Sequence, residues 1–157
     1  MKAVNVVVLA AAAALVQPAA AEDNRDKLIP EYMAAAMDCV KDYEMDFTVC
    51  KEMMKEGVNL AEEKYKPCKC VPACVAKKRK LMSEDGEYDV DAFGKAVFEF
   101  GYEPWSEEYK KVFPICKDSY KGQKNCDAAG ALAVCAWKNS KMMRDTIGQY
   151  MGQMDGE

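Results

Sequence analysis

Eight cysteines are the feature that most restricts how this 157-residue chain can fold. Cysteines at this density form either disulfide bonds or a zinc site, and the redox compartment decides between them. The spacings Cys68-x-Cys70 and Cys70-x3-Cys74 do not provide the paired Cys-x2-Cys knuckles of a zinc ribbon. The chain also has no histidine, which removes histidine-ligated zinc and haem sites. We therefore expect no metal and no other cofactor, and we expect disulfides if the chain is exported.

Residues 1–21 have the parts of a secretory signal peptide. Lys2 supplies a positive start, residues 6–16 form an uninterrupted apolar run, and three alanines before Glu22 offer a cleavage site. A transmembrane anchor is the alternative, but crossing a bilayer needs roughly 18 or more apolar residues. We therefore predict a secreted, extracellular domain over residues 22–157, without stable insertion into a membrane. In an oxidising compartment its eight cysteines favour four disulfides, although the pairing stays open at this point.

The patterning of the remaining residues is helical. β-Branched residues are few, Ala, Met, Glu and Lys dominate, and apolar side chains recur at intervals of three and four residues. A chain of this size buries enough surface for one core, so we predict a single all-α domain of six or seven helices stapled by disulfides. The predicted helices and turns cover residues 30–40, 46–55, 59–65, 71–82, 89–101, 106–121, 125–138 and 142–154.

Prolines and capping residues set several of these predicted boundaries. Pro30 and Pro72 are assigned to the first turns of their helices, where the missing N–H has no intrahelical partner. Pro67 is expected to end the short turn that precedes the third helix. Pro114 is expected to kink its helix or restart it, and Asp89 is expected to cap the fourth helix.

The cysteine spacing within helices restricts the possible disulfides. Cys70 and Cys74 are four residues apart, so they share one helix face and are better placed to bond other segments than each other. Cys126 and Cys135 are nine residues apart on a predicted helix, which separates their Cα atoms by about 13 Å. A disulfide needs these atoms within roughly 7 Å. The helix predicted over residues 125–138 should therefore be bonded to two different neighbours.

Charge and composition exclude two classes of function. The formal net charge of −4 argues against a nucleic-acid partner, because binding phosphates needs a basic surface. The only basic run, residues 77–80, is interpreted as a solvated helix face rather than a patch for anionic membranes or receptors. Without histidine the chain lacks Ser-His-Asp, Cys-His and phospholipase-type catalysis, and it has no Gly-x-Ser-x-Gly elbow. We therefore predict that it is not an enzyme and has no catalytic residues.

The cysteine spacing resembles that of a known family. The run Cys39-x30-Cys70-x3-Cys74-x41-Cys116-x9-Cys126-x8-Cys135 is similar to the six-cysteine signature of the insect odorant- and pheromone-binding proteins. The x3 and x8 gaps are its most diagnostic pieces. The stretch CVPACVAKKRKLMSEDGEYDV also looks like the family's third helix, its Asp-Gly turn and the start of its fourth helix. The resemblance covers nearly all of residues 22–157.

This resemblance implies a disulfide pairing: Cys39–Cys74, Cys70–Cys126 and Cys116–Cys135. Such a pairing agrees with separate partners for Cys126 and Cys135. Cys50 and Cys68 depart from the six-cysteine pattern. With the other six cysteines paired in the family's way, these two would form a fourth bridge, in an eight-cysteine variant of the family.

The resemblance further implies an extracellular carrier that binds small hydrophobic molecules, such as odorants, pheromones or fatty acids, in an internal apolar pocket. Transfer of apolar surface out of water, about 25 cal/mol per Å², would supply the affinity. The expected state is a monomer or weak homodimer, with a chemoreceptor as a further partner. The stretch 142–154 is the expected lid over the pocket.

Candidate pocket residues come from the predicted apolar helix faces and from offsets to the family's cysteines. The same residues could simply form the core, because apolar stripes are the normal interior of helical domains. Two other functions stay open: a non-chemosensory carrier of lipids or similar ligands, and a secreted interaction module without a cavity. A plant lipid-transfer protein is disfavoured, because the chain lacks an adjacent Cys-Cys pair. The candidates are Tyr32, Met33, Ala36, Leu81, Met82, Phe93, Val97, Tyr109, Phe113, Ala131, Leu132 and Ile147.

Overall fold

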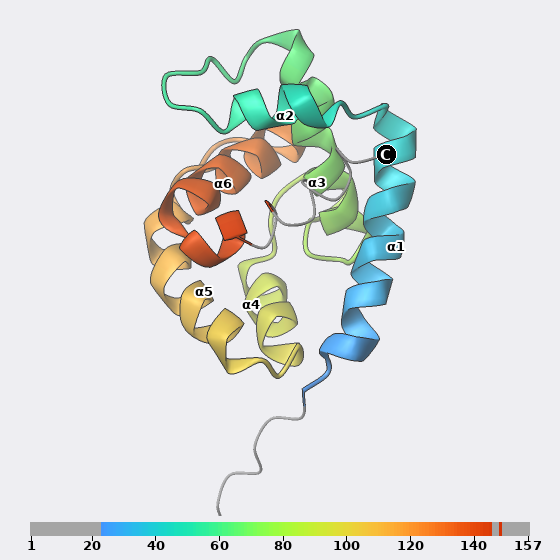
Figure 1. The fold of residues 1–157 in the computed structure, drawn as a ribbon, viewed down its shortest axis with the longest axis vertical. Helices are drawn as coiled ribbons and strands as arrows, with labels where there is room; N and C mark the ends of the chain where they lie inside the picture. Colours follow the sequence, from blue (N-terminus) through green and yellow to red (C-terminus); the bar gives the residue numbers. More distant parts are fainter. Residues whose placement is uncertain (1–22, 146–147, 149–157) are drawn as a thin grey trace, which may run out of the picture.

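The structure is a computed structural model that describes residues 23–145 and residue 148. Every regular element in this part of the chain is a helix (Figure 1), and β pairing is limited to an isolated bridge between Met82 and Tyr88. The prediction of an all-α fold is confirmed, whereas the predicted signal peptide lies outside the described residues. The elements are α1 (Arg25–Tyr43), α2 (Phe47–Met53), the 3-10 helix η1 (Glu63–Tyr65), α3 (Lys66–Lys78), α4 (Val90–Glu99), α5 (Glu103–Cys116) and α6 (Asn125–Asn139).

The arrangement of the helices is centred on α3. Figure 1 shows α3 between α1 and α6, and it packs against both. On the other side of α6 lies α5, which in turn packs against α4. The contacts therefore run from α1 through α3, α6 and α5 to α4. The contact between α3 and α6 joins α1 to the pair of helices α4 and α5.

Local sequence signals place two helix starts and one turn correctly. Asp46 caps α2 by accepting hydrogen bonds from the backbone N–H groups of residues 48 and 49. Asp89 caps α4 in the same way, with a 2.9 Å bond from the Ala92 N–H. Gly86 turns the chain between α3 and α4 with φ +84°, and a Cβ there would collide with Asn125 at 2.3 Å. This close approach ties the turn to the first residue of α6, whose N–H bonds the Gly86 carbonyl at 2.8 Å.

The structure corrects the predicted places of three prolines. Because α1 begins at Arg25, Pro30 lies inside the helix and not in its first turn. Because α3 begins at Lys66, Pro72 is also internal, and Pro67 opens this helix instead of ending the preceding turn. An internal proline removes one backbone hydrogen bond. The packing of α1 against α3 keeps both helices continuous across that loss, as tertiary contacts often do.

Two further helix boundaries differ from the prediction. The start of α5 is Glu103 rather than Ser106, with a proline in its first turn, and the helix does not restart at Pro114 but continues to Cys116. The end of α3 is Lys78, earlier than predicted, because the chain reverses at Lys80 with φ +57°. Pattern reading extends a helix wherever apolar spacing persists, and it misses a single residue in the left-handed conformation.

All eight cysteines are paired. Cα–Cα distances of 5.9, 5.4, 4.3 and 5.6 Å belong respectively to Cys39–Cys74, Cys50–Cys68, Cys70–Cys126 and Cys116–Cys135. The pairing implied by the family resemblance is thereby confirmed, together with the fourth bridge. Three of the bonds start from α3 and reach α1, α2 and α6. The fourth joins α5 to α6, so α6 is bonded to two different neighbours, as its cysteine spacing predicts.

Small residues and one lysine define the contact between α3 and α6. The buried core here contains four alanines, Ala73 and Ala76 from α3 and Ala128 and Ala129 from α6. Beside them Lys69 is only 8% exposed, and its Nζ donates to the Leu60 carbonyl at 2.8 Å and to Asp127 at 2.7 Å. A buried charge is tolerated when it is paired and hydrogen-bonded in this way.

The basic run at the end of α3 is occupied by contacts within the protein. Lys78 pairs with Asp38 at 3.3 Å, and Arg79 pairs with Glu31 at 3.0 Å while lying 4.4 Å from the centre of the Tyr32 ring. Lys78 and Lys80 are exposed, as predicted for a solvated face, but Lys77 and Arg79 are half-buried and residues 79 and 80 lie beyond the end of α3. Within the described residues, no helix combines the length and apolar character that crossing a bilayer requires.

The additional disulfide gives a stability prediction. The double variant Cys50→Ala/Cys68→Ala should lose about 3 kcal/mol of unfolding free energy, because the bond closes a loop of 18 residues and restricts the unfolded chain. Urea titration followed by circular dichroism measures this change, and the helical signal of the folded variant should match that of the wild type. An unchanged urea midpoint would contradict the prediction.

Candidate ligand-binding cavity

A partly open cavity of about 410 Å³ lies among α4, α5, α6 and the residues that follow α6. These three helices stand next to one another in Figure 1. Six of the lining residues are aromatic, and Glu108 is the only one that carries a charge. The lining consists of Tyr88, Phe93, Val97, Phe100, Trp105, Glu108, Tyr109, Val112, Phe113, Cys116, Leu132, Ala133, Ala136, Ser140, Met142 and Met143.

Aromatic rings from α4 and α5 form one wall of the cavity. The ring centres of Tyr109 and Phe113 are 4.8 Å apart, and Phe93 of α4 lies 5.8 Å and 6.1 Å from them. Spacing of four residues puts Trp105 on the same side of α5 as Tyr109 and Phe113. Gly94 allows α4 and the Tyr109 ring of α5 to approach closely, because a Cβ at that position would lie 3.2 Å from the Tyr109 hydroxyl.

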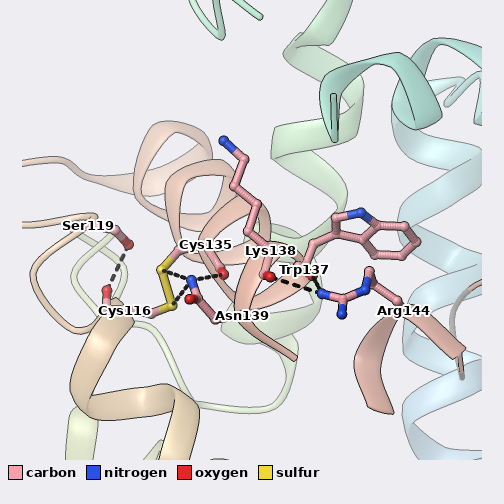
Figure 2. The surroundings of a disulfide bond; sticks show 7 residues. All are labelled: Cys116, Ser119, Cys135, Trp137, Lys138, Asn139 and Arg144. Atoms are coloured by element: carbon pink, nitrogen blue, oxygen red, sulfur yellow. Dashed lines mark hydrogen bonds between the residues drawn. A yellow bond between two sulfur atoms is a disulfide. The ribbon is translucent and has the colours of Figure 1, made fainter. Parts of the chain in front are cut away.

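The Cys116–Cys135 disulfide joins α5 to α6 beside the cavity (Figure 2). Cys116 is fully buried and lines the cavity. The Asn139 amide donates to the Cys135 carbonyl at 2.9 Å and lies 3.6 Å from the Cys135 sulfur. The Ser119 hydroxyl donates to the Cys116 carbonyl at 2.7 Å. The distance between α5 and α6, and with it the width of the cavity, is therefore set covalently.

The chain after α6 returns to the cavity through hydrogen bonds made by three residues. The Ser140 hydroxyl donates to the Glu108 carboxylate at 2.5 Å and accepts from the Met143 N–H at 2.9 Å. Arg144 donates to the carbonyls of Trp137 and Lys138 at 2.6 and 2.9 Å (Figure 2). Residues 141–145 are helical. This return brings Met142 and Met143 against the cavity.

The tyrosines near the cavity have perturbed acidities. Burial raises the pKa of Tyr88 to about 12, and the neighbouring Tyr120 adds a smaller contribution. Burial is also the main cause that raises the pKa of Tyr109 and of Tyr120. The Tyr88 ring contacts Phe93 and Tyr120, with centres 6.0 and 5.3 Å away. These hydroxyls are therefore neutral near physiological pH and can serve as hydrogen-bond donors or acceptors.

Five of the twelve residues predicted for the pocket line this cavity: Phe93, Val97, Tyr109, Phe113 and Leu132. They come from α4, α5 and α6, whose apolar stripes the sequence shows clearly. The structure brings these five together although nearly 40 residues of chain separate the first from the last. Six of the others do not line it, and Ile147 lies outside the described residues.

The other candidates have different surroundings. Leu81 and Met82 are buried in the core between α3 and α6. Tyr32 packs against this core and against Phe100, with the two ring centres 5.3 Å apart. Met33 is 41% exposed on α1. Ala36 and Ala131 are half-buried outside the lining, and Ile147 lies outside the described residues.

Several lining residues were not among the candidates. Trp105, Val112 and Cys116 share the apolar stripe of α5, so helical spacing already contained the signal that would have found them. Glu108 and Ser140 gave no such signal, because a polar residue on an amphipathic helix is normally assigned to solvent. Their place in the lining depends on how α5 and the chain after α6 are packed together.

Helices cross-linked by four disulfides beside a largely apolar cavity define a disulfide-stapled, all-α binding protein. The sequence profile of the PBP/GOBP family matches residues 21–139, and the chain belongs to this family. It is a family of carriers of small hydrophobic ligands, not of enzymes. Searches of the curated proteins and of the solved structures gave no match.

The raised pKa of Tyr88 predicts how stability changes in alkali. Its ordinary pKa is 10.0, so the unfolded chain loses this proton first and the free energy of unfolding falls as the pH rises from about 10 to about 12. The contribution of Tyr88 is at most about 3 kcal/mol. Urea titrations across this pH range should show a smaller fall for Tyr88→Phe than for the wild type. The control Tyr43→Phe, at an exposed position, should behave like the wild type, and equal falls in all three proteins would contradict the prediction.

Proposed function

We propose that residues 22–157, released from the predicted signal peptide, form a secreted carrier of small hydrophobic molecules such as odorants, pheromones or fatty-acid-like compounds. The observation that supports this function is the cavity of about 410 Å³ with a nearly apolar lining. This volume falls within the range of about 300–1,000 Å³ typical of small-molecule sites. The carrier acts as a monomer or weak homodimer and delivers its ligand to a partner such as a chemoreceptor.

The size of the hydrophobic effect is sufficient for a carrier. A ligand that buries about 300 Å² of apolar surface gains about 7 kcal/mol at 25 cal/mol per Å². Ordering costs reduce this value, while contacts with the aromatic walls add to it. The result is binding near the micromolar range. Such affinity allows the carrier to bind its ligand in an aqueous fluid and to release it again.

The cavity helps to distinguish the carrier function from the alternative functions. A secreted interaction module would have no need of an apolar space of this size, so the cavity argues against that function. A carrier outside chemosensation would use the same cavity and differ only in its ligand.

Filling the cavity should abolish ligand uptake. Ala133 of α6 lines the cavity, so Ala133→Phe places a ring in the space that a ligand would occupy. Binding of the fluorescent probe N-phenylnaphthylamine should weaken at least tenfold, as measured by fluorescence titration. The matched control is Ala34→Phe, which makes the same change on an exposed position of α1 and should bind like the wild type.

Two outcomes would contradict this prediction. The wild type could fail to take up the probe, or Ala133→Phe could bind it as tightly as the wild type does. Circular dichroism and the melting temperature of each variant separate a blocked cavity from a misfolded protein.

The residues after α6 should act as a lid. Truncation after Ser140 removes Met142 and Met143 from the cavity lining, so the probe should dissociate faster in a stopped-flow displacement experiment. Truncation after Asp145 keeps residues 141–145 of this segment and serves as the comparison. Equal dissociation rates in the full chain and in the Ser140 truncation would rule out a lid.

A further inference from the structure

Glu108 is an unusual residue for the wall of an apolar cavity. It lies in the middle of α5, is half-buried, and is the only charged side chain in the lining. One carboxylate oxygen, Oε1, accepts the hydrogen bond from Ser140. Within residues 23–145 the other oxygen, Oε2, has no hydrogen-bond donor and no cation within 4.0 Å. This oxygen is therefore accessible to solvent and open to a donor from a ligand.

Within residues 23–145 no basic side chain forms an ion pair with this carboxylate. Lys110 pairs with Glu107 at 2.6 Å, and its hydrogen bond is the main cause that lowers the pKa of Glu107, with Lys111 a minor one. Arg144 is engaged by the carbonyls at the end of α6. The twelve residues after Asp145 contain neither lysine nor arginine. Within residues 23–145 no cation of the protein therefore pairs with Glu108, which leaves this position to the cation of a ligand.

The aromatic surroundings suit a cation as well as an apolar body. Trp105 lies one helical turn before Glu108 on the same side of α5, and its ring meets the edge of Phe100 with centres 5.0 Å apart. Tryptophan is the ring that attracts cations most strongly, and this attraction grows where water is excluded. A carboxylate beside such a ring compensates the desolvation of an ammonium group, which apolar walls alone cannot do.

We propose that the cavity selects hydrophobic amines, with the ammonium group at Glu108 Oε2 and the hydrocarbon part against Phe93, Tyr109 and Phe113. This inference rests on the proposed carrier function and narrows its ligand class. A neutral alcohol donates a hydrogen bond to the same oxygen but gains no charge pairing. A fatty-acid carboxylate meets a like charge at the same oxygen, so it binds worst.

A series of three ligands with one hydrocarbon chain tests this proposal. Decylamine, decanol and decanoate compete with N-phenylnaphthylamine at pH 7.5, where the amine is protonated. For the wild type we expect decylamine to bind at least tenfold tighter than decanol, and decanoate to bind weaker than decanol. The variant Glu108→Gln keeps an acceptor for Ser140 but removes the charge, and it should bring the amine to within about threefold of the alcohol. The control Glu103→Gln changes an exposed glutamate of the same helix and should keep the wild-type order.

A second variant separates selectivity from structural support. Ser140→Ala removes the hydrogen bond to Glu108 while leaving the carboxylate in place. This variant should release the probe faster and yet retain the preference for the amine. If all three ligands displace the probe equally from the wild type, or decanoate binds best, the amine proposal is wrong and the carrier function stands. If the wild type does not take up the probe at all, the carrier function itself fails.

Discussion

Covalent bonding of α3 to three other helices is the constraint on which the rest of this structure depends. The bonds to α1, α2 and α6 leave α3 in the middle of the chain's fold, and a fourth bond extends the connection from α6 to α5. Helices held in this way do not rely only on side-chain packing to fix their separation. An apolar cavity forgoes packing contacts and lowers stability, and disulfides worth about 2–4 kcal/mol each offset that loss. The disulfides therefore supply the stability that allows the cavity to persist.

Two carboxylates serve different purposes on the two sides of α6. Lys69 and Asp127 pair next to the Cys70–Cys126 bond, where they satisfy each other and support the contact between α3 and α6. Glu108 lies on the side of α5, with one oxygen bonded to Ser140 and the other available to a ligand. The first carboxylate therefore contributes to the fold. The second is placed where it can distinguish one ligand head group from another.

Some of the site could be predicted because its signals are periodic. The stripe of α5 that contains Tyr109 and Phe113 and the apolar face of α4 with Phe93 and Val97 both follow helical spacing, and both line the cavity. Candidates on α1 and just after α3 were chosen by the same rule but lie elsewhere, Leu81 in the core and Met33 exposed. Helical spacing shows that a residue lies on the apolar face of its helix. It does not show whether that face packs against a neighbouring helix or borders an empty space. The prolines were misplaced for a related reason, since packing against neighbours holds α1 and α3 across an internal proline.

Helical periodicity and composition were enough to predict an all-α domain. The spacing of Cys126 and Cys135 was enough to exclude a bond between them, because helix geometry converts sequence separation directly into distance. Composition was likewise enough to exclude histidine chemistry. The place of the cavity, and the presence of Glu108 and Ser140 in its wall, followed from long-range packing that no local pattern encodes. Residues 108 and 140 meet because α5 and the chain after α6 converge beside the Cys116–Cys135 bond. Convergence of this kind depends on the relative orientation of whole helices, which is a property of the folded chain.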